Sequence, residues 1–335
     1  MGRRVVLDAP GRHRVETLPG PGAPGPGEVR VSVAAAGVCG SDRELYDGTR
    51  PAGYARYPLT PGHEWSGTVA AVGAGVDPAL VGRKTVGEGF RTCQLCERCR
   101  GGQTSLCSAG YDETGFTQPG AFADHLVLPA RLLHLLPDAA DLRAAALLEP
   151  AAVVAAAALA ARARPGESVA VLGCGTLGLL AVQLLAASSP AELTAVDPRP
   201  EALARAAAFG ATATAAPDDG PGGRCDLVVE TAGAPRSAAD AVRYARRGGR
   251  IVLTGIPGPG AQGLDPAGLV VRALTTHTVF GASPAAWAYA VRAFTSGLLN
   301  PEPLITHDLP LERYADAVAL VGGADPRAGK VLLHP

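Results

Sequence analysis

Four cysteines that lie close together constrain the fold of this 335-residue chain more than any other feature of its sequence. They follow the pattern C-x2-C-x2-C-x7-C, at Cys93, Cys96, Cys99 and Cys107. Four thiolates with such short spacers close tetrahedrally around one zinc ion, which leaves no position for a substrate. The alternative, a disulfide cluster, suits an oxidising compartment. Because the lobe has few apolar side chains, we expect a structural zinc ion to supply its folding energy.

Composition and charge exclude several classes of function. The chain carries 30 basic and 31 acidic side chains, a balance that attracts neither nucleic acid nor an anionic membrane surface. Arg3 and Arg4 are not followed by an apolar run of signal-peptide length, so we expect a cytoplasmic protein. The most apolar stretch, residues 144–161, contains Glu149 and Pro150 and predicts a buried helix rather than a membrane span.

The two halves of the chain differ in pattern. Residues 1–150 are rich in glycine and proline, with short β-branched runs that predict a β-rich domain. Beyond residue 165 strands alternate with helices, which predicts a parallel, doubly wound sheet and an α/β fold class. The predicted strands are 168–172, 193–196, 226–229 and 250–254, and the predicted helices are 176–187 and 200–209.

A glycine-rich loop lies between the first of these strands and the first helix. Its sequence is Gly173-Cys174-Gly175-Thr176-Leu177-Gly178, a G-x-G-x-x-G motif in the strand-to-helix context that gives the pattern its meaning. Gly173 makes the tight turn, Gly175 lets the backbone approach a pyrophosphate, and Gly178 lets helix and strand pack closely. Free N–H groups at the helix N-terminus would bind the phosphates. The motif predicts a Rossmann dinucleotide site.

Asp197 ends the next predicted strand, nineteen residues after Gly178. A carboxylate there accepts hydrogen bonds from an unmodified ribose and repels the 2′-phosphate of NADP, so the sequence favours NAD. Arg199 leaves alternatives open. It could pair with a phosphate, cover the adenine, or be a solvated loop charge.

A second set of metal-binding side chains is dispersed: Cys39, His63 and Glu149. Three such ligands would leave a fourth position on zinc for a substrate oxygen. Spacing alone does not distinguish them from structural residues.

An ordered series of segments supplies the missing context, because the sequence resembles the zinc-containing medium-chain dehydrogenase/reductase family over essentially its whole length. Besides the glycine loop and the cysteine lobe, the matching segments are GVCGSD (37–42), PGHEWSGTVAAVG (61–73), GAFADH (120–125), LLEP (147–150), VVETAG (228–233), VLTGIP (252–257), VFGAS (279–283), PLITHDLPLERYADA (303–317) and GKVLL (329–333). Within the family the chain is most similar to 2-deoxy-scyllo-inosamine dehydrogenases of aminoglycoside biosynthesis, followed by general polyol dehydrogenases.

The resemblance implies the domain organisation and the ligands of a catalytic zinc. A GroES-like catalytic domain would contain residues 1–150 and 281–335, including the zinc lobe at 93–107, and a Rossmann NAD-binding domain would contain residues 151–280. Cys39, His63 and Glu149 would hold the catalytic zinc, with Glu64 as an alternate ligand or a neighbour of the ligands. Glu149 stands where many alcohol dehydrogenases have cysteine, as in the sorbitol and threonine dehydrogenase branch. We therefore expect two zinc ions per chain and NAD.

The resemblance also assigns a proton relay and further cofactor contacts. Ser41 would accept the proton of the substrate hydroxyl. Glu44 stands where many members have a histidine that continues the relay. Either Glu44 accepts the proton, or it is a surface charge and the relay ends in water. The expected cofactor contacts are Gly173, Gly175, Thr176, Leu177, Gly178, Asp197, Arg199, Gly233, Thr254, Gly255, Gly281 and, at the pyrophosphate, Lys330.

The expected reaction is reversible oxidation of a secondary alcohol to a ketone, in a homodimer or homotetramer. Polar and aromatic groups beside the zinc ligands favour a small polar substrate such as an aminocyclitol. These are Glu44, Tyr46, Glu64 and Trp65. The alternatives are a general polyol or amino-alcohol dehydrogenase, a zinc-free reductase of the same fold, and a non-catalytic NAD-binding protein that keeps only the zinc of the lobe.

Overall fold

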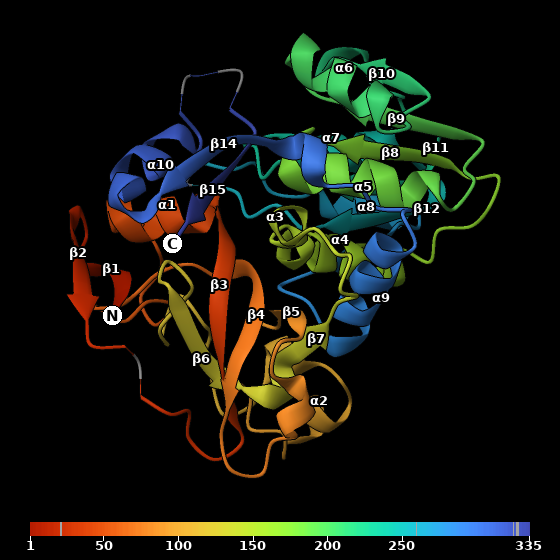
Figure 1. Ribbon diagram of the computed structural model, residues 1–335. Coiled ribbons are helices and arrows are strands. Elements are labelled where there is room, and N and C mark those ends of the chain that lie inside the picture. The colour runs from red at the N-terminus through yellow and green to blue at the C-terminus, as the bar shows by residue number, and fades with distance from the viewer. Residues whose placement is uncertain (21, 259, 324, 326–327) are drawn as a thin grey trace. The chain divides into compact units, whose positions relative to one another are not determined.

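The computed structural model describes residues 1–335 except 21, 259, 324 and 326–327, and the chain forms two compact units (Figure 1). The first unit contains Met1–Glu149 and Asn300–Pro335, and the second contains Pro150–Leu299. The second unit thus includes residues 281–299, which the resemblance placed in the first domain. These residues contain helix α9 (Pro284–Thr295), whose buried residues are Ala286, Trp287, Ala290 and Ala293.

A seven-stranded sheet forms the centre of the first unit. Its strands in spatial order are β14 (Ile305–Pro310), β15 (Lys330–His334), β3 (Glu28–Val38), β4 (Glu64–Val72), β5 (Lys84–Gly87) and β7 (Leu133–Leu135), with β6 (His125–Pro129) paired to β3. The pairs are antiparallel except β14 with β15. Strands β1 (Gly2–Ala9) and β2 (Arg12–Leu18) form a separate hairpin. The prediction of a β-rich first domain is confirmed.

Strand β3 positions the functional end of this sheet. Its first half alternates buried valines with polar residues, so one face meets the core, and its last four residues, 35–38, are all buried. Gly37 is the register partner of Glu64 on β4. A Cβ at Gly37 would lie 2.1 Å from Glu64 Oε2, so only glycine allows the carboxylate to approach the strand. Because β15 pairs with the other edge of β3, it brings Lys330 to the same end.

Four short helices complete the first unit. They are α1 (Gly40–Asp47), α2 (Glu97–Arg100), α3 (Leu142–Ala145) and α10 (Tyr314–Leu320). The main core lies against the sheet and includes Val31, Trp65, Phe122, Leu126 and Tyr314. Burial of large apolar side chains of this kind stabilises a domain by roughly 1.5–3 kcal/mol per residue.

A six-stranded parallel sheet forms the second unit. Its order is β10 (Ala213–Ala215), β9 (Glu192–Val196), β8 (Ser168–Leu172), β11 (Cys225–Glu230), β12 (Ala245–Leu253) and β13 (Thr275–Thr278). Counted from the first strand along the chain, this is the order 3-2-1-4-5-6 of a dinucleotide-binding fold, in which the strand order reverses beside β8. The predicted α/β fold class and Rossmann sheet are confirmed.

Helices α5 (Thr176–Ala186), α6 (Pro200–Ala208) and α7 (Ser237–Tyr244) pack against this sheet (Figure 1). The chain also forms α4 (Leu148–Ala161) and α8 (Pro266–Val271) in this part of the sequence, besides α9. The single buried helix predicted over 144–161 is in fact two, α3 and α4. Pro150 explains the break, because proline lacks an N–H group and is tolerated only in the first turn of a helix. Within the described part of the chain, every helix is too short or too polar to cross a membrane.

Candidate metal centres and cofactor site

The four cysteines of the lobe converge. Their Sγ atoms lie within 4.8 Å of one another. All seven cysteines of the chain are free thiols, so the structure does not support the disulfide alternative. Backbone N–H groups point at the sulfurs: Cys96 N lies 3.4 Å from Cys93 Sγ, and Cys99 N lies 3.4 Å from Cys96 Sγ. The N–H group of Cys99 lowers the pKa of Cys96 to about 5. Four preformed sulfur ligands fit one tetrahedral zinc ion.

A second donor set forms at the end of the main sheet. One ligand atom each from Cys39, His63 and Glu64 lies within 4.8 Å of the others. Cys39 directly follows β3 and caps α1, whereas His63 directly precedes β4 and Glu64 opens it, so the β3–β4 register brings them together. Among the residues that the structure describes, neither the buried Nδ1 atom of His63 nor the buried Oε1 atom of Glu64 has a hydrogen-bond partner. A half-buried thiol with a buried imidazole and a buried carboxylate fits a zinc ion with an open position.

Asp42 lies beside two members of this set, and the sequence analysis gave it no role. Its side chain is fully buried. Its Oδ2 accepts a hydrogen bond from the N–H group of Cys39 at 2.9 Å, and its Oδ1 lies 3.6 Å from His63 Nδ1. Burial alone would lower the pKa of His63, but Asp42 and Cys39 outweigh it and raise that pKa well above its ordinary value. The capping box at the start of α1 is the sequence signal that could have identified Asp42.

Ser41 and Glu44 have different surroundings. The Oγ atom of Ser41 lies 3.4 Å from His63 Nε2, so the predicted proton acceptor is beside the donor set. The Glu44 side chain is 45% exposed and its Oε2 lies 3.3 Å from Nη1 of Arg50. Of the two alternatives for Glu44, this ion pair favours the surface charge.

Glu149 and Lys330 also lie near the donor set. Burial raises the pKa of Glu149 to about 8, and its carboxyl group is close enough to feel the charges of His63 and Glu64. The tight three-residue set nevertheless contains Glu64 and not Glu149. The ammonium group of Lys330 is buried, forms an ion pair with Glu64 and donates to the Val38 carbonyl at 3.1 Å. Lys330 is therefore engaged at this end of the sheet, and its contact with a pyrophosphate stays a prediction.

The glycine loop of the second unit has the features that phosphate binding requires. Gly173 follows β8 with a φ of +90°. A Cβ at Gly178 would lie 1.7 Å from the Gly173 carbonyl oxygen, so glycine is obligatory there. Gly175 caps α5, and a Cβ there would meet no atom within 4 Å. Thr176 and Leu177 form the first turn of that helix. The loop therefore presents free backbone N–H groups toward open space at a helix N-terminus.

The Asp197 carboxylate accepts hydrogen bonds from Cys174 and Arg199. It is 3% exposed, and its Oδ2 accepts the N–H group of Cys174 at 2.7 Å. Arg199 binds it with two parallel contacts, Nε to Oδ1 at 2.9 Å and Nη2 to Oδ2 at 3.1 Å. Burial would raise the pKa of Asp197, but these hydrogen bonds keep it below its ordinary value. The sequence alternatives for Arg199 did not include this pair.

Glu230, a residue that the sequence analysis missed, forms hydrogen bonds to several residues at the carboxyl edge of the parallel sheet. It is buried at the end of β11, and its Oε1 accepts the N–H groups of Ala232 and Gly233, both at 2.8 Å. Its carbonyl oxygen accepts the Thr254 hydroxyl at 2.7 Å. A Cβ at Gly255 would lie 2.2 Å from Gly233 N. Gly281 follows β13 with a φ of +67°. These predicted cofactor residues therefore lie at or just beyond the carboxyl ends of β11, β12 and β13, where dinucleotides bind in this fold.

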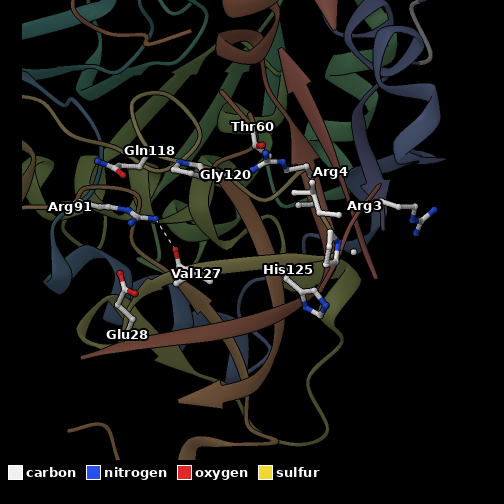
Figure 2. A pocket seen from close by; sticks show the side chains of 14 residues that line it. Arg3, Arg4, Glu28, Thr60, Arg91, Gln118, Gly120, His125 and Val127 are labelled. Carbon is white, nitrogen blue, oxygen red and sulfur yellow. Dashed lines mark hydrogen bonds between the residues drawn. The ribbon is translucent and has the colours of Figure 1, made fainter. Parts of the chain in front are cut away.

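A separate cavity of about 390 Å³ opens elsewhere in the first unit (Figure 2). Arg3, Arg4 and Arg91 line it, but their charges are engaged. Arg3 pairs with Asp124 at 3.1 Å, Arg4 pairs with Glu16 at 2.6 Å, and Arg91 donates to the Val127 carbonyl at 3.0 Å. The lining contains none of the predicted metal or catalytic residues, so the cavity is distinct from both metal centres.

Comparison with known proteins gives consistent matches. The family model described as alcohol dehydrogenase GroES-like domain matches residues 25–138, and that described as zinc-binding dehydrogenase matches residues 176–296. A sorbitol dehydrogenase of Bacillus subtilis (strain 168) is 31% identical, over 96% of this chain and 94% of the relative.

Two solved structures cover all of this chain. A zinc-binding dehydrogenase of Sinorhizobium meliloti 1021, bound to NADP, has a TM-score of 0.92 and 28% identity over 99% of its length. An alcohol dehydrogenase of Escherichia coli CFT073, complexed with NADH, has a TM-score of 0.91 and 28% identity over 99% of its length. Both forms of the nicotinamide dinucleotide therefore occur in structures similar to this chain.

Loss of one lobe ligand should remove metal and stability together. Cys96→Ser replaces a thiolate by a weak ligand, and we expect it to lower the zinc content by about one ion per chain and to lower Tm, because metal binding supplies folding energy. Metal analysis and thermal unfolding measure both. Cys225→Ser, at a buried cysteine of the second unit, is the control that should keep its zinc. Full zinc content in Cys96→Ser would contradict the assignment.

Proposed function

Since the chain belongs to the zinc-dependent medium-chain dehydrogenase/reductase family, we propose that it oxidises a ring secondary alcohol of a cyclitol or aminocyclitol to a ketone. Its broader class is that of a zinc-dependent polyol or alcohol dehydrogenase of the sorbitol and threonine type, with NAD(P) as cofactor. The candidate substrate is 2-deoxy-scyllo-inosamine of aminoglycoside biosynthesis, and the candidate assembly is a homodimer or homotetramer in the cytoplasm.

One observation carries the catalytic part of the proposal. A thiol, an imidazole and a carboxylate, from Cys39, His63 and Glu64, converge beside the Ser41 hydroxyl. A zinc ion bound there would act as a Lewis acid that lowers the pKa of an alcohol. Ser41 is placed to accept the proton that the alcohol loses, and the Asp42 carboxylate lies 3.6 Å from Nδ1 of the His63 imidazole. Glu149 is the second carboxylate within reach of the set.

The second unit supplies the hydride acceptor. The glycine loop would bind the pyrophosphate of the cofactor, whose nicotinamide accepts the hydride. Asp197 would accept hydrogen bonds from the adenosine ribose. The Asp197 carboxylate can accept hydrogen bonds from a neutral ribose while it stays paired with Arg199. The 2′-phosphate of NADP would be repelled by the carboxylate. If Arg199 instead turned to the phosphate, the buried charge of Asp197 would lose its cation. NAD is therefore the proposed cofactor.

A general polyol or amino-alcohol dehydrogenase is the alternative, favoured by the similarity to a sorbitol dehydrogenase. The four residues that suggested a polar substrate are less available to bind such a substrate than the sequence implied. Glu44 pairs with Arg50, Glu64 pairs with Lys330, and Trp65 is buried in the core. Tyr46 packs against the ring of Tyr314, with centroids 5.8 Å apart.

Removal of a proposed catalytic ligand should abolish turnover and spare the fold. We expect Cys39→Ala to lower kcat at least about a thousandfold, because several kcal/mol of charge stabilisation is lost. It should keep about one zinc ion per chain, in the cysteine lobe, and an unchanged Tm. Metal analysis and kinetics test this against Cys225→Ala as the control. Normal activity in Cys39→Ala would refute the proposed site.

The preference for NAD⁺ should require Asp197 and should not require Arg199. We expect kcat/KM to be at least about tenfold higher with NAD⁺ than with NADP⁺, because the buried carboxylate repels a phosphate. Asp197→Ala should narrow this gap. Arg199→Ala should maintain or widen it, since the nearby cation is lost. Steady-state kinetics with both cofactors decides, and a higher kcat/KM for NADP⁺ in the unmodified enzyme would sink the proposal.

A substrate panel separates the proposed function from its alternative. We expect NAD⁺ reduction with cyclitols and aminocyclitols to exceed that with sorbitol and threonine by at least about tenfold in kcat/KM, because a site built for ring hydroxyls rejects analogues that leave its polar groups unpaired. Ethanol and cyclohexanol serve as the unsubstituted controls. Higher activity with sorbitol or threonine would select the alternative, and activity confined to the controls would reject both.

A further inference from the structure

The cavity of the first unit lies on the outer face of the strand pair β3 and β6. On β3, Val29 is buried in the core and its neighbour Glu28 lines the cavity. On β6, Leu128 is buried in the core and its neighbour Val127 lines the cavity. Because successive side chains of a strand point to opposite faces, the cavity belongs to the face of this pair that the core does not use. Its polar side chains are therefore available to a ligand.

Arg91 brings a guanidinium group to this cavity without a carboxylate to balance it. Its Nε atom donates to the Thr114 hydroxyl at 3.2 Å and its Nη2 atom donates to the Val127 carbonyl at 3.0 Å, so both acceptors are neutral. Nη1 takes part in neither bond. The other two arginines of the cavity, Arg3 and Arg4, each pair with a carboxylate. Of the three, Arg91 is the one whose charge remains for a ligand.

Glu28 is the acidic residue that lines the cavity. Its Oε2 atom accepts the N–H group of Gly25 at 3.0 Å, and its Oε1 atom takes no part in that bond. The register of β3 with β6 makes Glu28 a diagonal neighbour of Val127, whose carbonyl binds Arg91. Figure 2 shows Glu28 and Arg91 toward the same end of the cavity.

These two opposite charges share a cavity and do not pair with each other. In the part of the chain that the structure describes, neither Arg91 nor Glu28 forms an ion pair, although both side chains are half-buried. Charges that lose part of their hydration are ordinarily paired. Other hydrogen bonds hold these two apart, so a ligand with one negative and one positive group can complete both.

The rest of the lining suits a small organic molecule. The volume of about 390 Å³ is within the range of small-molecule sites. Apolar side chains complete the wall: Leu18, Pro19, Pro119, Ala123 and Val127. An inorganic anion would be repelled by Glu28 and would gain nothing from this wall. A dipolar molecule with a short apolar body uses all three features.

We propose that this cavity is an accessory binding site for a small zwitterionic amino acid. Arg91 binds the carboxylate through Nη1 and the second hydrogen of Nη2, Glu28 accepts the ammonium group at Oε1, and the apolar wall contacts the side chain. The site is separate from both metal centres and goes beyond the proposed function. Its wall is continuous with the segment of a metal ligand, because Gly120 N donates to the carbonyl of Thr60, three residues before His63.

The test uses L-valine and its two halves. These are 3-methylbutanoate, which lacks the amine, and 2-methylpropylamine, which lacks the carboxylate. None of the three has a hydroxyl group, so none is a substrate of the proposed dehydrogenase. Dissociation constants are measured by calorimetry on the zinc-loaded protein at neutral pH. We expect valine to bind one site per chain at least about tenfold more tightly than either half, because a hydrogen bond to a charged group provides that factor.

Two variants locate the site. Glu28→Gln should abolish the preference for valine over 3-methylbutanoate, because glutamine can still accept the Gly25 N–H group but carries no charge. Arg91→Gln should weaken valine binding at least about tenfold, since the carboxylate loses its cation. Arg131→Gln is the matched control. Arg131 also donates from Nη2 to a carbonyl, that of Thr92 at 3.0 Å, but it does not line the cavity, and its loss should leave the affinity for valine unchanged.

Several results would overturn the inference. They are no binding of valine, equal affinities for valine and 3-methylbutanoate in the unmodified protein, a preference that survives Glu28→Gln, or an affinity for valine that Arg91→Gln leaves unchanged. If Arg91→Gln does not fold, as judged by circular dichroism and zinc content, Arg91→Lys replaces it. Lysine keeps the charge and loses the planar fork, so valine should bind more weakly, and an unchanged affinity would again overturn the inference. Turnover of the alcohol panel tests the proposed function separately.

Discussion

The close approach of Glu64 to strand β3 is the constraint on which the catalytic end of the first unit depends. Gly37 leaves room for the carboxylate, and Lys330, from the strand on the other side of β3, pairs with it. A larger residue at Gly37 would displace both charges, and loss of Lys330 would leave a buried anion without its cation. Cys39 lies two residues beyond Gly37, so the register of β3 also fixes the first ligand relative to the second.

The two metal centres differ in how much of their geometry is local. In the cysteine lobe, the spacing of Cys93, Cys96 and Cys99 lets backbone N–H groups point at sulfurs within a few residues, so the sequence alone predicts the site. The catalytic set joins residues from separate segments through the pairing of strands. The spacing of residues along the sequence does not show which strands pair, so this set of ligands could be predicted only through a family resemblance.

The same distinction explains which predictions held. The alternation of strands and helices is a local signal, and it predicted the parallel sheet and the glycine loop. Long-range partners gave no such signal. The role of Asp42 depends on where His63 lies, the Arg199 pair depends on the bend after β9, and the burial of Lys330 depends on the pairing of β15 with β3. The sequence analysis therefore did not predict the ion pair of Lys330 with Glu64, and it missed the buried carboxylate of Glu230.

Buried carboxylates recur at the functional positions, and each is held by a different kind of donor. Asp197 is bound by a guanidinium, Glu64 by an ammonium, and Glu113 by a phenol. A full cation on a neighbouring carboxylate keeps it ionised in a region of low dielectric, and leaves less of its charge for a ligand. A phenol orients the carboxylate but brings no positive charge to it, and burial raises the pKa of Glu113. Burial acts in the same direction on Asp197, but the hydrogen bonds from Arg199 and Cys174 outweigh it and keep the pKa of Asp197 below its ordinary value. The kind of donor therefore decides whether a buried carboxylate in this protein stays readily ionised.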